Sequence, residues 1–316
     1  MEIPELQYET LGKVYQVNIL PRIQINQKRE KLGEIENEIK ELNDLFSSKQ
    51  TVLGFDIFQY SQYKAEEQIL IPVLFGLIYN DAWNLAIQNY SYIFQKYDHY
   101  NLANTLDYKK YFISTGDGGF QIIDSPIHAI LFLVVFSTIL RFYNSGLYIP
   151  LIKEKIGIID IRYAISYDNI YHYMDNYYGS GIINNARMMG KDKLNRLLID
   201  RNIYNWFLEN ITGIENLISI GLDEISEIKE FEGYDGKRIS VENNALISAN
   251  TKIIKMEGFK SIDIQKIGEI TEKKTKMDIY NIHLQAIIDY RSFFHIQKVV
   301  TVSIGNLNTT GISENT

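Results

Sequence analysis

Two aspartates occupy positions from which their carboxylates can hold metal ions together. Asp117 lies in the corner Gly116-Asp117-Gly118-Gly119, between two short apolar runs. Glycines on both sides let the backbone turn sharply and let a ligand come close, so we expect Asp117 to stand exposed at a hairpin tip. Asp56 ends an earlier apolar run, just before a helix-like stretch. Two carboxylates at adjacent strand ends can share a pair of divalent cations.

Asp-Gly is also a common turn signal without any chemistry, but a third stretch favours a chemical role. The segment DNYYGSGIINNARMMG, at positions 175–190, is a glycine-containing turn that enters a helix. In this order the three stretches resemble the catalytic domain of class III nucleotide cyclases, which make cyclic nucleotides from nucleoside triphosphates. The resemblance covers residues 48–290. DIFQYS at 56–61 fits the end of that family's first strand, and Gly116-Asp117 fits its hairpin tip.

The resemblance implies a reaction in which the ribose 3'-hydroxyl attacks the α-phosphorus and expels pyrophosphate. Two divalent ions, Mn²⁺ or Mg²⁺, held about 3.5 to 4 Å apart, lower the pKa of such a hydroxyl and steady the triphosphate. Hard ions prefer oxygen ligands. The resemblance assigns these ligands to Asp56, Asp117 and the backbone carbonyl of Ile57.

The helix within 175–190 carries the residues that the resemblance places at the nucleotide. Arg187 is implied at the α-phosphate, because a planar guanidinium can meet two oxygens and stays charged. Asn184 is implied near the ribose. The family's Asn and Arg are four residues apart, whereas these are three apart and Ile183 takes the fourth position. A spacing of three still shares a helical face; Asn185 is the alternative.

A lysine near the C-terminal strands often contacts the triphosphate in the resembled family. Lys266, in IQKIGEI, is the candidate here, with Lys255 and Lys260 as rivals. For any one of the three, a solvated lysine is the competing interpretation.

The residue that reads the base departs from the purine cyclases. Adenylate cyclases place a lysine four residues before the hairpin aspartate and guanylate cyclases place a glutamate there, whereas this chain has Ile113. An aliphatic side chain cannot form either hydrogen bond to the base edge, and Tyr60 can help fill the space of a purine. Asp175 or Asn176, near a second base contact of the family, can separate the pyrimidines.

This combination resembles the pyrimidine cyclases of the bacterial anti-phage system called Pycsar, which make cyclic UMP or cyclic CMP. UTP is the expected substrate, because uridylate cyclases are the commoner type. The product is implied to act on a separate effector protein. The alternatives are a cytidylate cyclase, an adenylate or guanylate cyclase with unusual base contacts, and a non-catalytic dimerisation module.

In the resembled family each site lies between two subunits. One subunit contributes the aspartates and the other contributes the Asn/Arg helix. This chain has both sets, so a homodimer would form two equivalent sites.

The elements that must position these residues alternate between strands and helices. We expect a strand at Val52–Asp56, then a helix kinked by Pro72 and a second helix around 83–97. Asp124-Ser125-Pro126 predicts the start of a buried helix over Ile127–Leu140. The residues expected on the apolar face of the first helix are Ile69, Leu70, Val73, Leu74, Leu77 and Ile78. Further strands are expected at 156–164, 167–174, 251–267 and 276–284 and within 195–208, and a partly helical segment at 218–230.

This alternation predicts an α+β fold with a ferredoxin-like class III cyclase core, a mixed split β-α-β sheet with helices on one face. Residues 47–290 form the expected catalytic domain, after an N-terminal helical extension at 1–46 and before a C-terminal extension at 291–316. The amphipathic repeat within 32–46 predicts a helix that forms a dimer arm or packs on its own domain. From Val302 onward we expect a frayed or disordered tail.

Composition excludes several other classes of protein. The chain of 316 residues has no cysteine, so it has neither disulfides nor a thiolate metal site. A net charge of -7 with scattered lysines argues against a nucleic-acid-binding surface. The most apolar run, Ile127–Leu140, is shorter than a membrane span of about twenty residues, and His128 within it is expected to be a core residue. We see no signal peptide and expect a cytoplasmic protein.

Overall fold

The computed structural model describes residues 49–89, 108–173, 176–192, 196–211, 220–221, 253–272, 275–291 and 297–306. The predicted N-terminal extension at 1–46, the second half of the predicted helix at 83–97 and nearly all of the predicted segment at 218–230 lie outside these ranges.

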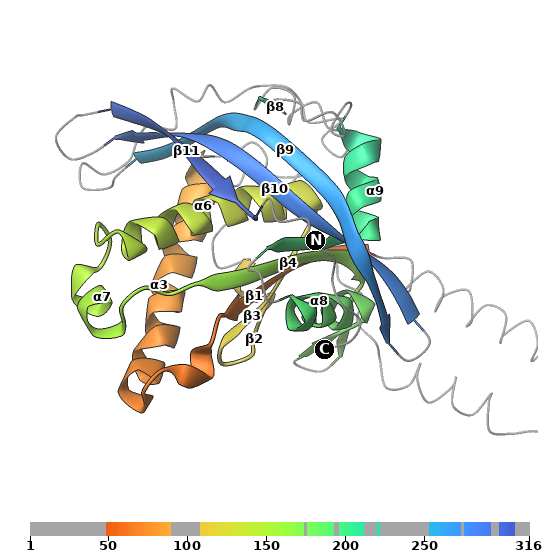
Figure 1. Cartoon of the computed structure of the whole chain (residues 1–316), viewed down its shortest axis with the longest axis horizontal. Coiled ribbons are helices and arrows are strands. Elements are labelled where there is room, and N and C mark those ends of the chain that lie inside the picture. Colours follow the sequence, from red (N-terminus) through yellow and green to blue (C-terminus); the bar gives the residue numbers. More distant parts are fainter. Residues whose placement is uncertain are drawn as a thin grey trace, which may run out of the picture.

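Strands and helices alternate through the first half of the chain, and a long hairpin follows (Figure 1). The elements are β1 (Lys49–Ile57), η2 (Tyr60–Gln62), α3 (Ala65–Asn89), β2 (Phe112–Ser114), β3 (Gly118–Ile123), α6 (Pro126–Asn144), α7 (Pro150–Ile156), β4 (Ile161–Asn169), β5 (Tyr171–Tyr173), β6 (Asn176–Tyr178), α8 (Ser180–Lys191), β7 (Leu197–Asp200), α9 (Arg201–Asn210), β8 (Ile220–Gly221), β9 (Ile253–Glu272), β10 (Thr275–Arg291) and β11 (Gln297–Ile304).

The main sheet has the order β2-β3-β1-β4-β7-β10-β9-β8, with β11 paired to β10. β1 is antiparallel to both β3 and β4, and β4 is parallel to β7. The succession β1-α3-β2-β3-α6-β4 is therefore the split β-α-β arrangement of a ferredoxin-like core. The predicted α+β fold with a mixed sheet is confirmed.

Helices cover both faces of this sheet, whereas we expected them on one. Leu53 and Phe55 of β1 pack with α3 and α6, while Val52 packs with Met188 and Met189 of α8 on the other face. The reason is that β1 is apolar on both faces until Asp56, so each face needs a cover. α8 is the helix that was predicted to carry the nucleotide contacts.

The two predicted helices of the 61–97 region are one helix over their described part, α3, which contains Pro72. Its apolar face is also rotated from the prediction, since Ile69 and Val73 are 72% and 53% exposed. The aromatic residues decide the orientation: Phe75 packs against Phe55 at 5.6 Å between ring centroids, and Trp83 stacks on Phe132 at 4.2 Å.

α6 is the buried helix that the sequence predicts, and Ser125 precedes its first residue, Pro126. His128 is 6% exposed and shares a 2.7 Å hydrogen bond with the Ser125 hydroxyl, so it is a core histidine as expected. Among the described residues, α6 and the Ala65–Ile87 part of α3 are long and apolar enough to cross a membrane. The apolar window of α6 is 89% buried inside the fold, as in the core helix of a globular domain.

One strand prediction and one disorder prediction need correction. The expected strand at 156–164 is wrong in its first half, because α7 ends at Ile156 and Gly157 follows it at φ 83°. β4 instead runs on without a break from 161 to 169. The disorder expected from Val302 is also wrong for the described residues, since Val302 and Ile304 are buried on β11.

α8 is fixed to the sheet by one buried asparagine. The Asn185 amide nitrogen donates to the carbonyl of Val52 at 2.8 Å and to that of Ala164 at 3.0 Å. It therefore joins β1 and β4 under the helix. Gly54 makes room for this contact, because a Cβ there would lie 2.0 Å from the Asn185 Oδ1. Asn185 is a structural residue and does not serve as the alternative ribose contact.

Replacing Asn185 by Ala should lower the free energy of unfolding by about 2 kcal/mol, since two buried carbonyls lose their donor. Urea denaturation followed by circular dichroism measures this change. Asn205→Ala, at an exposed asparagine of α9, is the control. A change at Asn185 within about 0.5 kcal/mol of that control would contradict the assigned role.

Candidate active site

Backbone pairing brings Asp56 and Asp117 together. Asp56 opposes Gly118 across the β1–β3 pair, and the Ile57 N–H donates to the Asp117 carbonyl at 2.9 Å. The approach requires glycine at position 118, where φ is 158° and a Cβ would lie 2.1 Å from the Phe55 carbonyl oxygen. Asp117 is half-buried at the hairpin tip, less exposed than expected.

The Asp56 carboxylate has a partner that the sequence analysis missed. Arg162 of β4 lies directly opposite it, and the Arg162 Nε donates to Asp56 Oδ2 at 2.6 Å. Burial raises the pKa of Asp56, the Arg162 guanidinium opposes that rise, and the nearby Asp117 carboxylate adds to it. Arg162 falls in the second half of the strand predicted at 156–164, where it belongs to no motif, and the register of β4 against β1 could not be predicted.

The donor set at this end of β1 fits a hard divalent ion. The Asp117 carboxylate lies near enough to act electrostatically on Asp56. The Ile57 carbonyl points to the same side of the strand as its N–H, toward the hairpin. The described residues contain no group of three or more His, Cys, Asp or Glu side chains able to hold a metal ion. Oxygens from a substrate or from water must therefore complete the shell, as is usual for Mg²⁺ at triphosphates.

Tyr60 and Ile113 flank the aspartates on different elements. Tyr60 follows β1 in η2, and its hydroxyl donates to the Gln68 carbonyl at 3.0 Å. Ile113 lies on β2 opposite Phe120 and packs, partly buried, against the hydrophobic cluster that contains Phe120. Ile113 offers no hydrogen-bonding group to a purine, and the Tyr60 hydroxyl proton is already engaged by Gln68.

The predicted contacts on α8 divide between two sides of the helix. The Asn184 amide donates to Asp168 Oδ2 at 3.3 Å, on the flank toward β7 and β10. At about 100° per residue, Arg187 falls with Ile183 on the side opposite the buried Asn185. Ile183 is 51% exposed, so this side of α8 faces away from the chain's own sheet.

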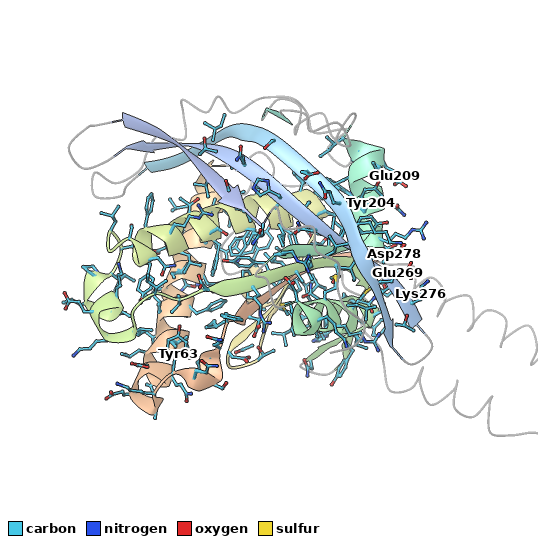
Figure 2. The ribbon with its side chains drawn as sticks, viewed as in Figure 1. Tyr63, Tyr204, Glu209, Glu269, Lys276 and Asp278 are labelled. Carbon is cyan, nitrogen blue, oxygen red and sulfur yellow. The ribbon has the colours of Figure 1, made fainter. Side chains whose placement is uncertain are left out.

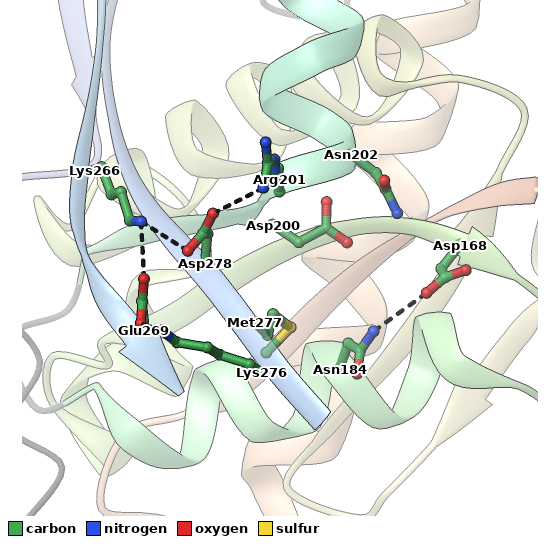
Figure 3. A pocket seen from close by; sticks show the side chains of 10 residues that line it. All are labelled: Asp168, Asn184, Asp200, Arg201, Asn202, Lys266, Glu269, Lys276, Met277 and Asp278. Atoms are coloured by element: carbon green, nitrogen blue, oxygen red, sulfur yellow. Dashed lines mark hydrogen bonds and ion pairs between the residues drawn. The ribbon is translucent and has the colours of Figure 1, made fainter. Parts of the chain in front are cut away.

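Asn184 and Lys266 line one pocket of about 570 Å³ (Figure 3). Lys266 makes an ion pair of 2.7 Å with Asp278 and one of 3.1 Å with Glu269. Arg201 and Lys276 add two more cations to the wall. The full set of lining residues is Asp168, Asn184, Asp200, Arg201, Asn202, Lys266, Glu269, Lys276, Met277 and Asp278. Two predicted nucleotide contacts thus share one polar cavity.

The aspartates and this pocket lie at opposite ends of the same strand pair. Asp56 opposes Arg162, whereas Gln50 opposes Asp168, six residues back along β1, which is about 20 Å of strand. Figure 2 shows the same separation, with Tyr63 near the end of β1 far from Glu269 and Lys276. The two predicted half-sites, the aspartates and the pocket, therefore do not meet within one chain.

The remaining candidates contribute little that the structure can place. Asp175 lies outside the described residues, as do the side chains at positions 255 and 260 of β9. Asn176 begins β6, and its Oδ1 accepts the Tyr177 N–H at 2.9 Å.

No family model matches the chain, and no curated protein matches it. Among solved structures it is similar to the adenylyl cyclase CyaB from P. aeruginosa, with 12% identity, a TM-score of 0.39, and coverage of 74% of this chain and 93% of that one. It is also similar to a monomeric guanylyl cyclase domain from the fungus Blastocladiella emersonii, with 14% identity, a TM-score of 0.37, and coverage of 55% of this chain and 90% of that one. A structure of adenylate cyclases from Trypanosoma brucei has 12% identity, a TM-score of 0.37, and coverage of 74% of this chain and 89% of that one. At these scores the likenesses carry no argument about activity.

Asp200 is a buried carboxyl at the base of the pocket. Its oxygens accept the N–H groups of Ile203 and Tyr167, which caps α9 and ties it to β4. Burial raises the pKa of Asp200 from 3.8 to about 7, against these backbone donors and with help from nearby Asp168.

A raised carboxyl pKa means that the folded state holds a proton which the unfolded chain releases above about pH 4. The stability that wild type gains over Asp200→Asn should therefore fall between pH 4 and 7, by up to about 1.4 kcal/mol per pH unit, and level off above pH 7. Chemical denaturation across this pH range measures the difference. A difference that rises with pH would contradict the assignment.

Proposed function

We propose that this chain is a pyrimidine nucleotide cyclase that converts UTP to 3',5'-cyclic UMP and pyrophosphate. The observation that carries the proposal is the convergence of Asp56 and Asp117 through the Ile57 N–H to Asp117 carbonyl contact of 2.9 Å. A hairpin tip that served only as a turn would not need a second carboxylate beside it.

The residues of the two half-sites match the needs of the reaction. Two divalent ions, when bound, would activate the ribose hydroxyl and neutralise the triphosphate. Asp56, Asp117 and the Ile57 carbonyl would hold them. Arg162, beside Asp56, adds a guanidinium that can meet phosphate oxygens.

The pocket at the other end of β1 supplies the remaining contacts. Lys266 would meet the triphosphate and Asn184 the ribose, while Arg187 would reach the α-phosphate from the outward side of α8. Because the half-sites lie at opposite ends of β1, the enzyme would work as a homodimer in which each site takes the aspartates of one subunit and the pocket of the other.

Two features support a pyrimidine and favour uracil. Ile113 offers no group to a purine edge. The Asn176 carbonyl oxygen accepts the Tyr177 N–H, and in that orientation its amide nitrogen can donate to a ligand. A donor suits the O4 carbonyl of uracil and not the amino group of cytosine. In keeping with the Pycsar resemblance, the product would be a cytoplasmic signal of anti-phage defence, read by a separate effector.

The test is incubation of the purified protein with UTP, CTP, ATP and GTP, each with Mn²⁺, followed by mass identification of products. Cyclic UMP should dominate. Asp117→Ala should reduce turnover at least about a hundredfold because a metal ligand is lost, while Asn205→Ala should not change it. Cyclic CMP would move the assignment to cytidylate cyclase, and cyclic AMP or GMP would refute the pyrimidine assignment. If no nucleotide gave a product, the non-catalytic dimerisation module would be the remaining alternative.

A further inference from the structure

Arg162 is held at four points around Asp56. Its Nε and Nη2 both donate to Asp56 Oδ2, the first at 2.6 Å. Its Nη1 donates to the Asp192 carbonyl at 2.8 Å, just beyond the end of α8. Its guanidinium carbon lies 5.5 Å from the centroid of the Phe58 ring, within the range of a cation–π contact. The guanidinium is therefore fixed in place beside the proposed metal ligand.

This arrangement leaves half of the Asp56 carboxylate open. Both guanidinium nitrogens bind the same oxygen, Oδ2, so Oδ1 remains for another ligand. The Arg162 and Asp56 side chains are 21% and 20% exposed. At such a partly desolvated position, charges interact more strongly than in bulk water. An ion that binds Oδ1 meets a fixed positive charge a few ångströms away.

A second arginine nearby shows the contrast with a purely structural ion pair. Arg196 is 2% exposed and pairs with Asp192 at 2.9 Å, and its backbone N–H also donates to that carboxylate at 3.0 Å. Asp192 is itself buried, so neither charge of that pair is open to a ligand from solvent. Arg162, by contrast, reaches a half-site that opens to solvent.

We propose that Arg162 is the built-in counter-ion of Asp56, and that divalent ions bind this site against its charge. Asp56, Asp117 and Arg162 carry a net charge of about -1, whereas the two carboxylates alone would carry -2. Arg162 therefore keeps free metal weakly bound until a polyanionic substrate adds negative charge beside the guanidinium. The inference rests on the proposed function only in taking Asp56 as a metal ligand.

The test is a titration of the protein with Mn²⁺ in the absence of nucleotide. The loss of the free-Mn²⁺ signal in electron paramagnetic resonance measures binding. Arg162→Gln should bind Mn²⁺ about tenfold more tightly than wild type, because one opposing charge is gone. Arg162→Lys keeps the charge and should stay within about twofold. Lys155→Gln removes the same unit of charge from the exposed helix α7 and should also stay within about twofold.

Equal or weaker Mn²⁺ binding by Arg162→Gln would overturn the proposal, because an arginine that only orients Asp56 gives that result. The same holds if Asp56→Asn binds Mn²⁺ as wild type does. Circular dichroism checks that each variant is folded. Arg162→Met, which keeps an apolar stem over Phe58, replaces the Gln variant if that one unfolds and carries the same tenfold expectation.

The outcome is separable from the proposed activity. If Arg162→Gln gains Mn²⁺ affinity but wild type cyclises no nucleotide, the counter-ion stands and the cyclase proposal fails. If wild type turns over UTP but Arg162→Gln binds Mn²⁺ no more tightly than wild type, the cyclase proposal stands and the counter-ion proposal fails.

Discussion

The site depends on the antiparallel register of β1 between β3 and β4. That register sets Asp56 opposite Gly118 on one side and opposite Arg162 on the other. Because paired strands lie about 4.8 Å apart, the backbone itself brings two acidic residues from distant parts of the chain to one place. Arg162 then offsets part of the repulsion between them. The carboxylates stand together because their strands pair, before any ion is bound.

The same pairing keeps the rest of the proposed site away. β4 runs antiparallel to β1, so Asp168 and the Lys266 pocket lie at the strand end remote from Asp56. α8 is locked over the middle of this pair by Asn185, and its Ile183 side faces outward. No rotation of a side chain spans such a gap. The proposed homodimer would resolve the geometry, because a symmetric pair of chains could set the aspartate end of one against the pocket end of the other.

The sequence predicted the parts of this arrangement that depend on local pattern. Glycines around Asp117, Pro126 after Ser125, and the turn before α8 each specify a backbone shape, and those elements formed as predicted. The sequence did not predict the features that depend on packing between distant parts of the chain. The orientation of α3 follows from aromatic contacts made across the core, and the burial of Asn185 follows from its reach to two strands at once. The role of Arg162 could not be predicted, because it depends on the register of β4 against β1. Asn184 and Lys266 line one pocket, and the nucleotide roles that the resemblance implies for both stay predictions.

The most direct test of the shared-site account is subunit complementation. Asp117→Ala and Arg187→Ala would each be inactive alone, because one damages the metal half-site and the other the nucleotide half-site in every dimer. After mixing and subunit exchange, the rate of cyclic UMP formation should recover to about a quarter of wild type, since half the dimers are mixed and each has one intact site. A mixture that stays inactive although mass spectrometry detects mixed dimers would contradict the account.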